Sequence, residues 1–392
     1  MKKNFLFISP WINPFEPYYG AAQRSYLLLR ALLECGNVDV VVFRDEIKLD
    51  YTMNGCEVIH SHPVRSSRPI SRAKKWFGLL MPWDPYSFYP VDEGKEAVID
   101  GLVSKKTYDA IVVRYIPDAM SCGLMKYADR LVIDVDDHPK DQLKMMAQLA
   151  TSGLNKLYHS IASSLSSITV NCLVNRIKAG FFSNPNQVVG RHGAFLPNVP
   201  LEEPSADYVM FNATTPRLFF VGYLDYYPNY SGLDFFVENV WPMVKATVPE
   251  AEFHIAGKIV GESSESYRRK WEEIEGVSVL GFVEDIKDEY DTCRATVSPI
   301  YVGAGTNIKL VESIQRKRVC VTTNVGVRGM KSFFVSGEEV LVANNAKEYA
   351  QLCIQALTDE SFNHQIARNA YMKMKDCFSH EAFNQIVKNA LG

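Results

Sequence analysis

The sequence lacks several features that would each assign it to a particular class of protein. Its 392 residues carry a net charge of −3, so no overall attraction to nucleic acid or to an anionic membrane is expected. Its eight cysteines form no C-x-x-C pair and no regular framework, which suits reduced thiols in a cytosolic protein. No apolar run approaches the roughly 20 residues that a membrane-spanning helix needs, and no internal repeat is apparent. These absences favour a cytoplasmic, globular protein that binds no nucleic acid.

The remaining pattern alternates short apolar runs with amphipathic segments, which predicts an α/β fold with two doubly wound parallel sheets. Expected strands in the first half are Asn4–Ser9, Val38–Phe43, Cys56–Ile59, Ala110–Arg114, Leu131–Val135 and Ile168–Val170. Expected strands in the second half are Arg217–Val221, Glu252–Ala256, Val277–Leu280, Thr296–Ile300, Val319–Thr323 and Val340–Val342. The proline-rich segment LPNVPLEEPS between the halves is typical of a linker.

The segment Pro299–Met330 combines a glycine-rich turn, GAGT, with one basic and one acidic side chain. It leads from a predicted strand into a helix that Thr306 is suited to cap. Free amides at the start of such a helix bind phosphate, and glycine lets a phosphate oxygen approach the backbone. Lys309 and Glu312 are three residues apart and share one face of this helix. That face suits a cation beside a diphosphate and a carboxylate beside ribose, or else an ordinary surface Lys–Glu pair.

A second candidate site is the sequence DVDDHP, which follows the predicted strand at 131–135. Its three carboxylates and histidine have the ligand types of a divalent-metal site. Alternatively, Asp137 or His138 contacts a reacting sugar or an acceptor hydroxyl. In a third interpretation, the aspartates cap the next helix. Arg114, at the end of the preceding strand, either shares this site or pairs with Asp134.

Two further segments stand out from the regular pattern. The loop Pro10–Gly20, rich in proline and aromatic residues, joins the first strand to the first helix, where parallel sheets bind ligands. The alternative for this loop is a rigid connection without a ligand. In residues 64–84, basic residues precede tryptophan and other apolar residues, a composition that suits peripheral contact with an anionic membrane at its inner face. The alternative here is that the apolar part packs on its own domain.

On these motifs the chain resembles the retaining GT-B glycosyltransferases of family 4, also called group 1, in the subgroup with a GAGT turn. The resemblance rests on this turn with Lys309 and Glu312, on GYLD at 222–225 and on LPN at 196–198. It implies two Rossmann-like domains that face a central cleft. Residues 1–198 would form the acceptor-side domain and residues 199–375 the nucleotide-sugar domain, with a helix in 376–392 crossing back to the first domain.

The function implied by this resemblance is transfer of a hexosyl or deoxyhexosyl group from a nucleotide diphosphate sugar to a hydroxyl of a glycan or lipid-linked acceptor. Such transfer serves polysaccharide biosynthesis and would proceed with retention, with no metal or other cofactor. The implied catalytic residues are Asp137, His138, Lys309 and Glu312. The implied donor-binding residues are Gly20, Ala21, Arg24, Gly222, Tyr223, Gly257, Phe282, Val283, Gly305, Thr306, Asn307, Ile308, Lys309 and Glu312.

The sequence departs from the family pattern at three positions. Ala304 replaces the first glutamate of a common pair, and Tyr223 and Asn229 replace an arginine and a lysine that clamp the diphosphate. Tyrosine and asparagine donate hydrogen bonds but do not neutralise phosphate. Two alternatives therefore remain beside the transferase: a non-hydrolysing nucleotide-sugar epimerase, and a catalytically degenerate GT-B protein that only binds.

Overall fold

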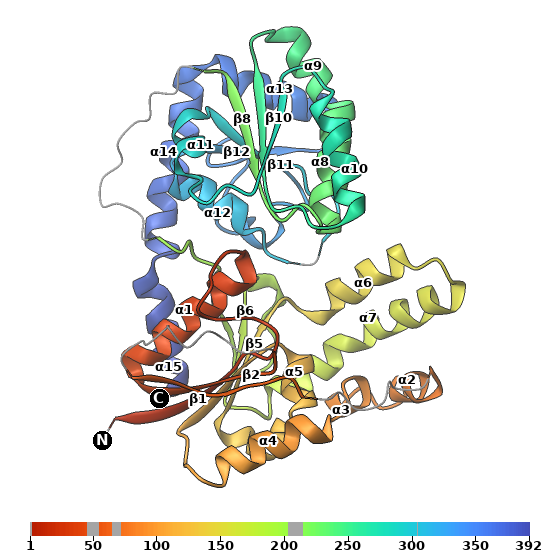
Figure 1. Cartoon of the computed structure of the whole chain (residues 1–392), viewed down its shortest axis with the longest axis vertical. Helices are drawn as coiled ribbons and strands as arrows, with labels where there is room; N and C mark the ends of the chain where they lie inside the picture. Colours follow the sequence, from red (N-terminus) through yellow and green to blue (C-terminus); the bar gives the residue numbers. More distant parts are fainter. Residues whose placement is uncertain (1, 45–54, 65–71, 203–214, 304) are drawn as a thin grey trace. The chain divides into compact units, whose positions relative to one another are not determined.

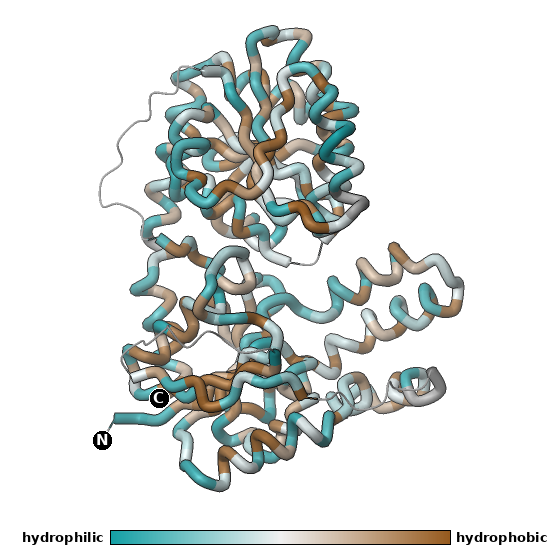
Figure 2. The backbone as a smooth tube through the Cα atoms, viewed as in Figure 1, coloured by the Kyte–Doolittle hydropathy of each residue, from teal (hydrophilic) through white to brown (hydrophobic). Residues whose placement is uncertain are grey.

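The computed structural model describes residues 2–44, 55–64, 72–202, 215–303 and 305–392. The chain forms two compact units, coloured along the sequence in Figure 1. Unit 1 comprises Met1–Pro197 and His380–Gly392, and unit 2 comprises Asn198–Ser379. In both units, apolar residues run along the sheet strands, as Figure 2 shows. No helix within the described ranges combines the length and the apolar character that crossing a bilayer requires.

Unit 1 is built on a seven-stranded sheet of order β3-β2-β1-β4-β5-β6-β7, with every neighbouring pair parallel. Its strands are β1 (Lys3–Ile8), β2 (Gly36–Val42), β3 (Cys56–Ser61), β4 (Ala110–Arg114), β5 (Leu131–Asp136), β6 (Ala179–Phe182) and β7 (Gly193–Phe195). The strand order reverses between β1 and β4, so the loops after these two strands diverge at the carboxyl edge of the sheet. Ligands of open α/β sheets bind at such a switch point.

The helices of unit 1 are α1 (Gly20–Cys35), α2 (Arg72–Gly78), α3 (Pro85–Phe88), α4 (Glu93–Val103), α5 (Ile116–Ser121), α6 (Pro139–Leu149), α7 (Gly153–Val174) and α15 (His380–Leu391). Two 3-10 turns, η1 (Leu124–Arg130) and η2 (Pro185–Gln187), complete it. The last helix of the chain returns to this unit and packs on α1, where Asn384 Nδ2 donates a hydrogen bond of 2.7 Å to Glu34 Oε1.

Unit 2 repeats this plan with a six-stranded sheet of order β10-β9-β8-β11-β12-β13. Its strands are β8 (Arg217–Val221), β9 (Glu252–Ala256), β10 (Val277–Gly281), β11 (Ala295–Ser298), β12 (Val319–Thr323) and β13 (Leu341–Ala343). Its helices are α8 (Tyr227–Asn239), α9 (Trp241–Thr247), α10 (Glu262–Glu272), α11 (Lys287–Thr292), α12 (Ile308–Gln315), α13 (Ala346–Thr358) and α14 (Glu360–Cys377), with one 3-10 turn, η3 (Arg328–Met330). The switch point of this sheet lies between β8 and β11.

The two-sheet α/β fold predicted from the sequence is confirmed, but one expected strand is wrong. Residues 168–170 lie within α7, where Val170, Leu173 and Val174 are buried on one face at helical spacing. Ile168, Thr169 and Val170 are all β-branched, which favours a strand locally, but packing of the buried face makes this segment helical. The short strands β6 and β7 were not predicted, because four and three residues are too few to show a period.

Candidate functional site

Lys309 spans the switch point of unit 2. It follows the first residue of α12, which comes after β11, and its side chain reaches the turn that ends β8. A Cβ atom built on Gly222 would lie 2.7 Å from Lys309 Cε and 3.2 Å from Nζ. The ammonium nitrogen also lies 5.5 Å from the centroid of the Phe220 ring. Lys309 thus brings a positive charge to bare glycine backbone, at the position where open sheets bind ligands.

Burial lowers the pKa of Lys309 to about 8, although the neighbouring Glu312 carboxylate raises it. The ammonium form therefore predominates at neutral pH but is less stable than in water. An anion placed beside Nζ would stabilise this charge, as phosphate groups do with lysine in nucleotide sites. Glu312 lies one turn along the same helix and is half-buried.

The turns at the carboxyl ends of β8, β9 and β10 are joined through glycine backbone. The amide of Gly222 donates to Ala256 O at 3.0 Å, and the amide of Gly257 donates to Gly281 O at 2.7 Å. A Cβ atom on Gly257 would lie only 1.8 Å from Gly222 O. Residue 257 must therefore be glycine for the Gly222 turn to keep its place beside Lys309.

The two residues that replace the expected arginine and lysine differ in their environments. Asn229 is buried, and its Nδ2 donates a hydrogen bond of 2.7 Å to the carbonyl of Tyr223, so it supports the turn from inside. Tyr223 itself is exposed. Beyond β10, the Phe282 ring is 61% exposed and so lies outside the core. Val283 packs against a small core cluster that includes Phe219.

At the GAGT turn, Asn307 and not Thr306 caps α12. The Asn307 side-chain oxygen accepts a hydrogen bond of 3.3 Å from the amide of Lys309, and its Nδ2 donates to Ser298 Oγ at 2.5 Å. Thr306 instead packs on Gly329, where an added Cβ would lie 2.7 Å from Thr306 Oγ1. The guanidinium of Arg328 donates to Gly303 O and brings a second positive charge to this turn.

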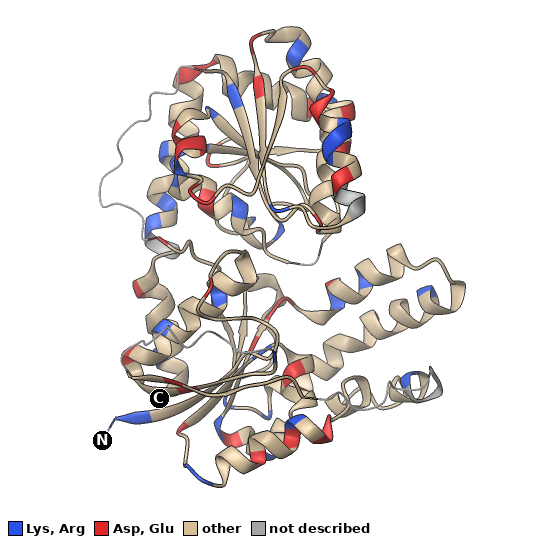
Figure 3. Ribbon diagram, viewed as in Figure 1, with Lys and Arg blue, Asp and Glu red and all other residues tan. Residues whose placement is uncertain are grey.

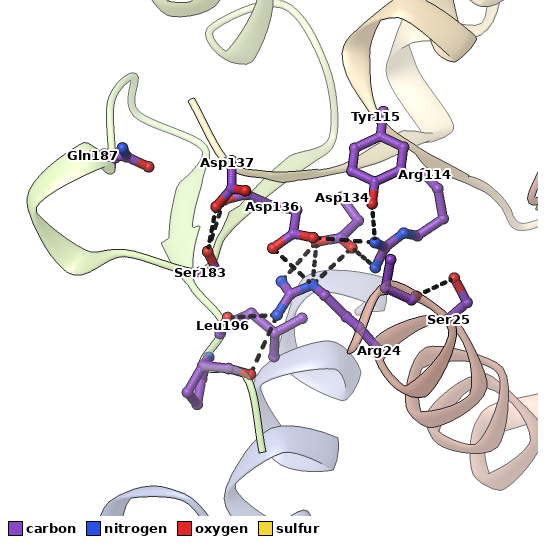
Figure 4. Close-up of polar contacts among 12 residues, drawn as sticks. Arg24, Ser25, Arg114, Tyr115, Asp134, Asp136, Asp137, Ser183, Gln187 and Leu196 are labelled. Carbon is purple, nitrogen blue, oxygen red and sulfur yellow. Dashed lines mark hydrogen bonds and ion pairs between the residues drawn. The ribbon is translucent and has the colours of Figure 1, made fainter. Parts of the chain in front are cut away.

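In unit 1 the carboxyl ends of β4 and β5 hold a buried group of two arginines and two aspartates, which Figure 4 shows. Arg24, from α1, donates to Asp134 through Nη2 at 2.7 Å and Nε at 2.9 Å, and through Nη1 to Leu196 O at 3.0 Å. Arg114 donates to Asp134 Oδ2 at 2.6 Å and to Asp136 Oδ2 at 3.1 Å. Burial raises the pKa of Asp134, but the two guanidinium groups outweigh it and hold that pKa below its usual range.

Asp136, a member of this group, and Tyr115, which contacts it, both have a positive backbone φ angle, which is rare for residues other than glycine. Tyr115 has a φ of 66° and Asp136 a φ of 58°, and they stand at the carboxyl ends of the neighbouring strands β4 and β5. The ring of Tyr115 lies 4.6 Å from the guanidinium carbon of Arg114, whose Nη2 donates to the phenol oxygen. Strained non-glycine residues persist where surrounding contacts fix them, and they gather at functional sites.

His138 begins α6 as its N-cap residue. Its Nδ1 accepts a hydrogen bond of 3.0 Å from the amide of Lys140, and its ring stacks on Phe182 with centroids 6.5 Å apart. Burial lowers the pKa of His138 to about 4, although Asp141 raises it, so the ring is neutral at physiological pH. Because Nδ1 is the acceptor, the ring proton lies on Nε2, which is then a hydrogen-bond donor.

Residues 215–359 match the model of the group 1 glycosyl transferases. Unit 2 contains a group 1 glycosyltransferase domain. The chain is 26% identical over 203 residues to an uncharacterized 44.6 kDa protein in the cps region of Klebsiella pneumoniae, a match that covers 50% of this chain and 51% of that protein.

Solved structures show that the whole chain has the GT-B fold of such enzymes. Sucrose-phosphate synthase from Thermosynechococcus elongatus superposes with a TM-score of 0.68 at 14% identity, over 99% of this chain and 98% of that one. HepE of Anabaena, crystallised with UDP and glucose, superposes with a TM-score of 0.64 at 12% identity, over 99% of this chain and 98% of that one. WaaG, a glycosyltransferase involved in lipopolysaccharide biosynthesis, gives 0.60 at 13% identity over 98% of both chains.

Within the glycosyltransferase domain, the structure gathers most of the predicted donor residues on one edge of one sheet. Gly222, Tyr223, Gly257, Phe282 and the GAGT turn all follow carboxyl ends of its strands, whereas Ala304 lies outside the described residues. Gly20 and Ala21 begin α1 in the other unit. Arg24, one turn further along α1, donates to Asp134 and to the carbonyls of Leu196 and Pro197 in unit 1, and these contacts favour a positioning role over donor contact.

The structure decides one of the three interpretations of DVDDHP, the helix cap. Asp134 and Asp136 pair with arginines, Asp137 accepts a hydrogen bond of 3.2 Å from Ser183 Oγ, and His138 provides the helix cap. The alternative that an aspartate caps α6 is therefore wrong. In the described parts of the chain, no three His, Cys, Asp or Glu side chains converge as they do around a metal ion. The sequence marked the loop Pro10–Gly20 as a candidate ligand loop but did not predict that Trp11 in this loop donates a hydrogen bond of 3.0 Å to Asp118, which follows β4.

Proposed function

We propose that this protein is a glycosyltransferase that moves a sugar from a nucleotide diphosphate sugar to a hydroxyl group of a glycan or lipid-linked acceptor. The observation that carries this proposal is the position of Lys309 against the Gly222 turn, at the switch point of a group 1 glycosyltransferase domain. A nucleoside diphosphate is the anionic ligand that such a cation, glycine backbone and helix N-terminus fit together.

Each part of this site has a role in donor binding. The amides of Gly305–Ile308 and the Lys309 ammonium would bind the diphosphate, and Glu312 would accept hydrogen bonds from ribose hydroxyls. The exposed ring of Phe282 offers a face for the nucleobase. Since HepE was crystallised with UDP and glucose, a UDP-sugar is the first donor to test.

Charge develops on the leaving diphosphate as its bond to the sugar breaks. Preorganised amides and the Lys309 cation stabilise that charge without rearrangement, and this effect is usually the largest in catalysis. Arg328, held at the same turn, adds to the positive potential. In unit 1, the Nε2–H of His138 would donate to a hydroxyl group of a substrate, and the carboxylate of Asp137 would accept from one. We propose transfer with retention at the anomeric carbon and without a metal ion.

An exposed apolar surface on unit 1 supports peripheral contact with an anionic membrane. Five of its side chains are more than half exposed: Phe77 (60%), Leu80 (67%), Trp83 (58%), Leu154 (69%) and Leu157 (52%). The two parts of the surface meet where the ring of Trp76 packs against Tyr158, with centroids 5.6 Å apart. Neither α2 nor α7 contains an acidic residue, and Figure 3 marks basic positions on both helices in blue. Apolar side chains flanked by lysine suit an anionic lipid surface.

Co-sedimentation with vesicles tests this membrane contact. Vesicles of phosphatidylglycerol should sediment the protein and vesicles of phosphatidylcholine should not, and a double variant Leu154→Ser, Leu157→Ser should bind less to the former. Equal binding of the variant would show that α7 does not contact lipid.

A thermal-shift panel with UDP, GDP, ADP, dTDP and CDP tests the donor site. A nucleotide that binds the folded state raises the midpoint of unfolding, by an amount set by its concentration relative to its dissociation constant. We expect one nucleotide to raise it and Lys309→Met to abolish that rise. No rise with any nucleotide would overturn the proposal and leave a binding protein of another kind. Donor turnover without an acceptor would indicate the epimerase instead.

A further inference from the structure

The indole ring of Trp11 is held in place on the carboxyl edge of unit 1 and yet remains 59% exposed. It lies in the loop after β1, and its Nε1 donates a hydrogen bond of 3.0 Å to Asp118 Oδ1. Asp118 belongs to the first turn of α5, just after β4. This bond therefore joins the two loops that diverge at the switch point of the unit 1 sheet. Neither of its residues belongs to the buried Arg–Asp group.

Lys95 fixes the same ring from inside the domain. This residue of α4 is only 6% exposed, and its Nζ lies 4.6 Å from the centroid of Trp11 and 5.7 Å from that of Phe43. Among the described residues, no carboxylate lies within ion-pair distance of this ammonium group. The cation is thus stabilised by the two aromatic faces, and in return it orients the indole. The backbone carbonyl of Trp11 also accepts a hydrogen bond of 3.2 Å from Arg44 Nη1.

Asp118 supplies the polar half of this arrangement. The residue is 6% exposed, and while Oδ1 accepts from the indole, Oδ2 accepts no hydrogen bond from the described part of the chain. Burial raises the pKa of Asp118 to about 6, although Lys95, the Trp11 hydrogen bond and Arg114 lower it. Among the described residues, Asp118 Oδ2 is not one of the fully buried side-chain oxygens without a partner, so it keeps contact with solvent, and a hydroxyl group of a ligand would donate to it there.

We propose that Trp11 and Asp118 form a sugar-binding subsite for the acceptor, with Lys95 as the residue that positions the indole. The carbon–hydrogen face of a pyranose ring would pack on the exposed indole, and one of its hydroxyl groups would donate to Asp118 Oδ2. A tryptophan that only stabilised the fold would bury most of its ring, whereas this ring is fixed by two contacts, with Asp118 and Lys95, and is left open. The inference rests on the proposed glycosyltransferase function, because it assigns the acceptor of that reaction to unit 1.

The test uses saturation-transfer NMR on the full-length protein saturated with UDP. The probes are the methyl glycosides of glucose, galactose and rhamnose. We expect at least one probe to receive saturation, most strongly at ring C–H protons, and Trp11→Ala to lose this signal. Asp118→Asn keeps an acceptor for the indole but presents an NH₂ group in place of Oδ2. It should weaken binding about 5-fold or more, a loss typical of one hydrogen bond to a charged group.

Trp83→Ala is the matched control, because Trp83 is 58% exposed on the same unit but lies outside the subsite. It should leave the signal unchanged, and the UDP-induced rise of the unfolding midpoint should be the same in all three variants. Equal signals in Trp11→Ala and the wild type, or no signal from any glycoside, would overturn the subsite. Absence of UDP binding in the wild type would instead overturn the proposed function, so the two failures are distinguishable.

Discussion

The ammonium group of Lys309 lies against the backbone of Gly222, so that the helix after β11 contacts the turn after β8. Any side chain at position 222 would occupy the volume that Lys309 Cε and Nζ now fill. A side chain at position 222 would displace the end of Lys309, so glycine here keeps the cation at the switch point, where open sheets bind ligands.

Nucleotide binding should be linked to protonation of Lys309. Its pKa of about 8 in the free protein would rise when a diphosphate lies beside Nζ, so binding takes up a proton near and above pH 8. UDP affinity should therefore fall as the pH rises from 7 to 9. Calorimetry at pH 8.5 in two buffers of different ionisation enthalpy measures the proton uptake. Lys309→Met should abolish it, whereas Lys287→Met, on exposed α11, should not; pH-independent affinity would contradict the assignment.

Gly257→Ala should damage the donor site through the neighbouring turn. The new methyl group would lie 1.8 Å from Gly222 O, so the Gly222 turn must move. We expect a loss of about 1–3 kcal/mol in the free energy of unfolding, as for overpacked sites, together with loss of UDP binding. Gly101→Ala is the control, since no atom lies within 4 Å of its added Cβ and helix α4 should tolerate it. Urea denaturation and UDP titration of both variants provide the comparison.

The buried Arg–Asp group should be sensitive to loss of one partner. Arg24→Met leaves Asp134 with one guanidinium in place of two, and breaking a buried pair typically costs about 3–5 kcal/mol. Arg268→Met removes the ion pairs with Glu265 and Glu272 on the surface of α10 and should leave stability nearly unchanged. Because the pKa of Asp134 is lowered by folding, its contribution is present above the unfolded pKa and disappears as the pH falls through the lowered value. Urea titrations at pH 7 and at about pH 3, below the unfolded pKa, measure both effects.

His138 combines a structural and a chemical role that two variants separate. His138→Ala removes the cap of α6 and should cost about 1 kcal/mol, whereas His138→Asn restores a capping side chain. Both variants lose the Nε2–H donor, so both should reduce transfer if that donor contacts substrate. Full activity of His138→Asn would restrict the residue to helix capping. Since folding lowers the pKa of His138 to about 4, its neutral form is favoured in the folded state, and stability should fall between pH 6.5 and 4.

The sequence predicted the sheets well and the polar contacts poorly, for a physical reason. Buried parallel strands such as β4 and β12 begin with the apolar runs AIVV and VCV, which predict their places in the sequence. The place of Lys309 on a helix face, together with the family resemblance, predicted its position in the donor site. Arg24 and Asp134 are 110 residues apart, and their contact could not be inferred from spacing, because only the folded sheet brings α1 to the end of β5.

The helix caps show the same limit on a smaller scale. Thr306 and Asn307 are both good capping residues, so the choice between them depended on Gly329 and Ser298, which lie elsewhere in the fold. The contact between Trp11 and Asp118 could not be predicted for a related reason. Their hydrogen bond exists only because β1 and β4 are neighbours in the sheet.

The most direct measurement follows release of nucleoside diphosphate from a panel of nucleotide sugars with glycan and lipid-linked acceptors, using the wild type and Glu312→Gln. The charge of Glu312 is removed while its size is kept, so the fold should persist and melting should confirm it. We predict acceptor-dependent release by the wild type and a loss of at least about 100-fold in the variant, a typical effect of removing one preorganised contact. Equal rates for the two proteins would contradict the account, because the donor would then bind elsewhere.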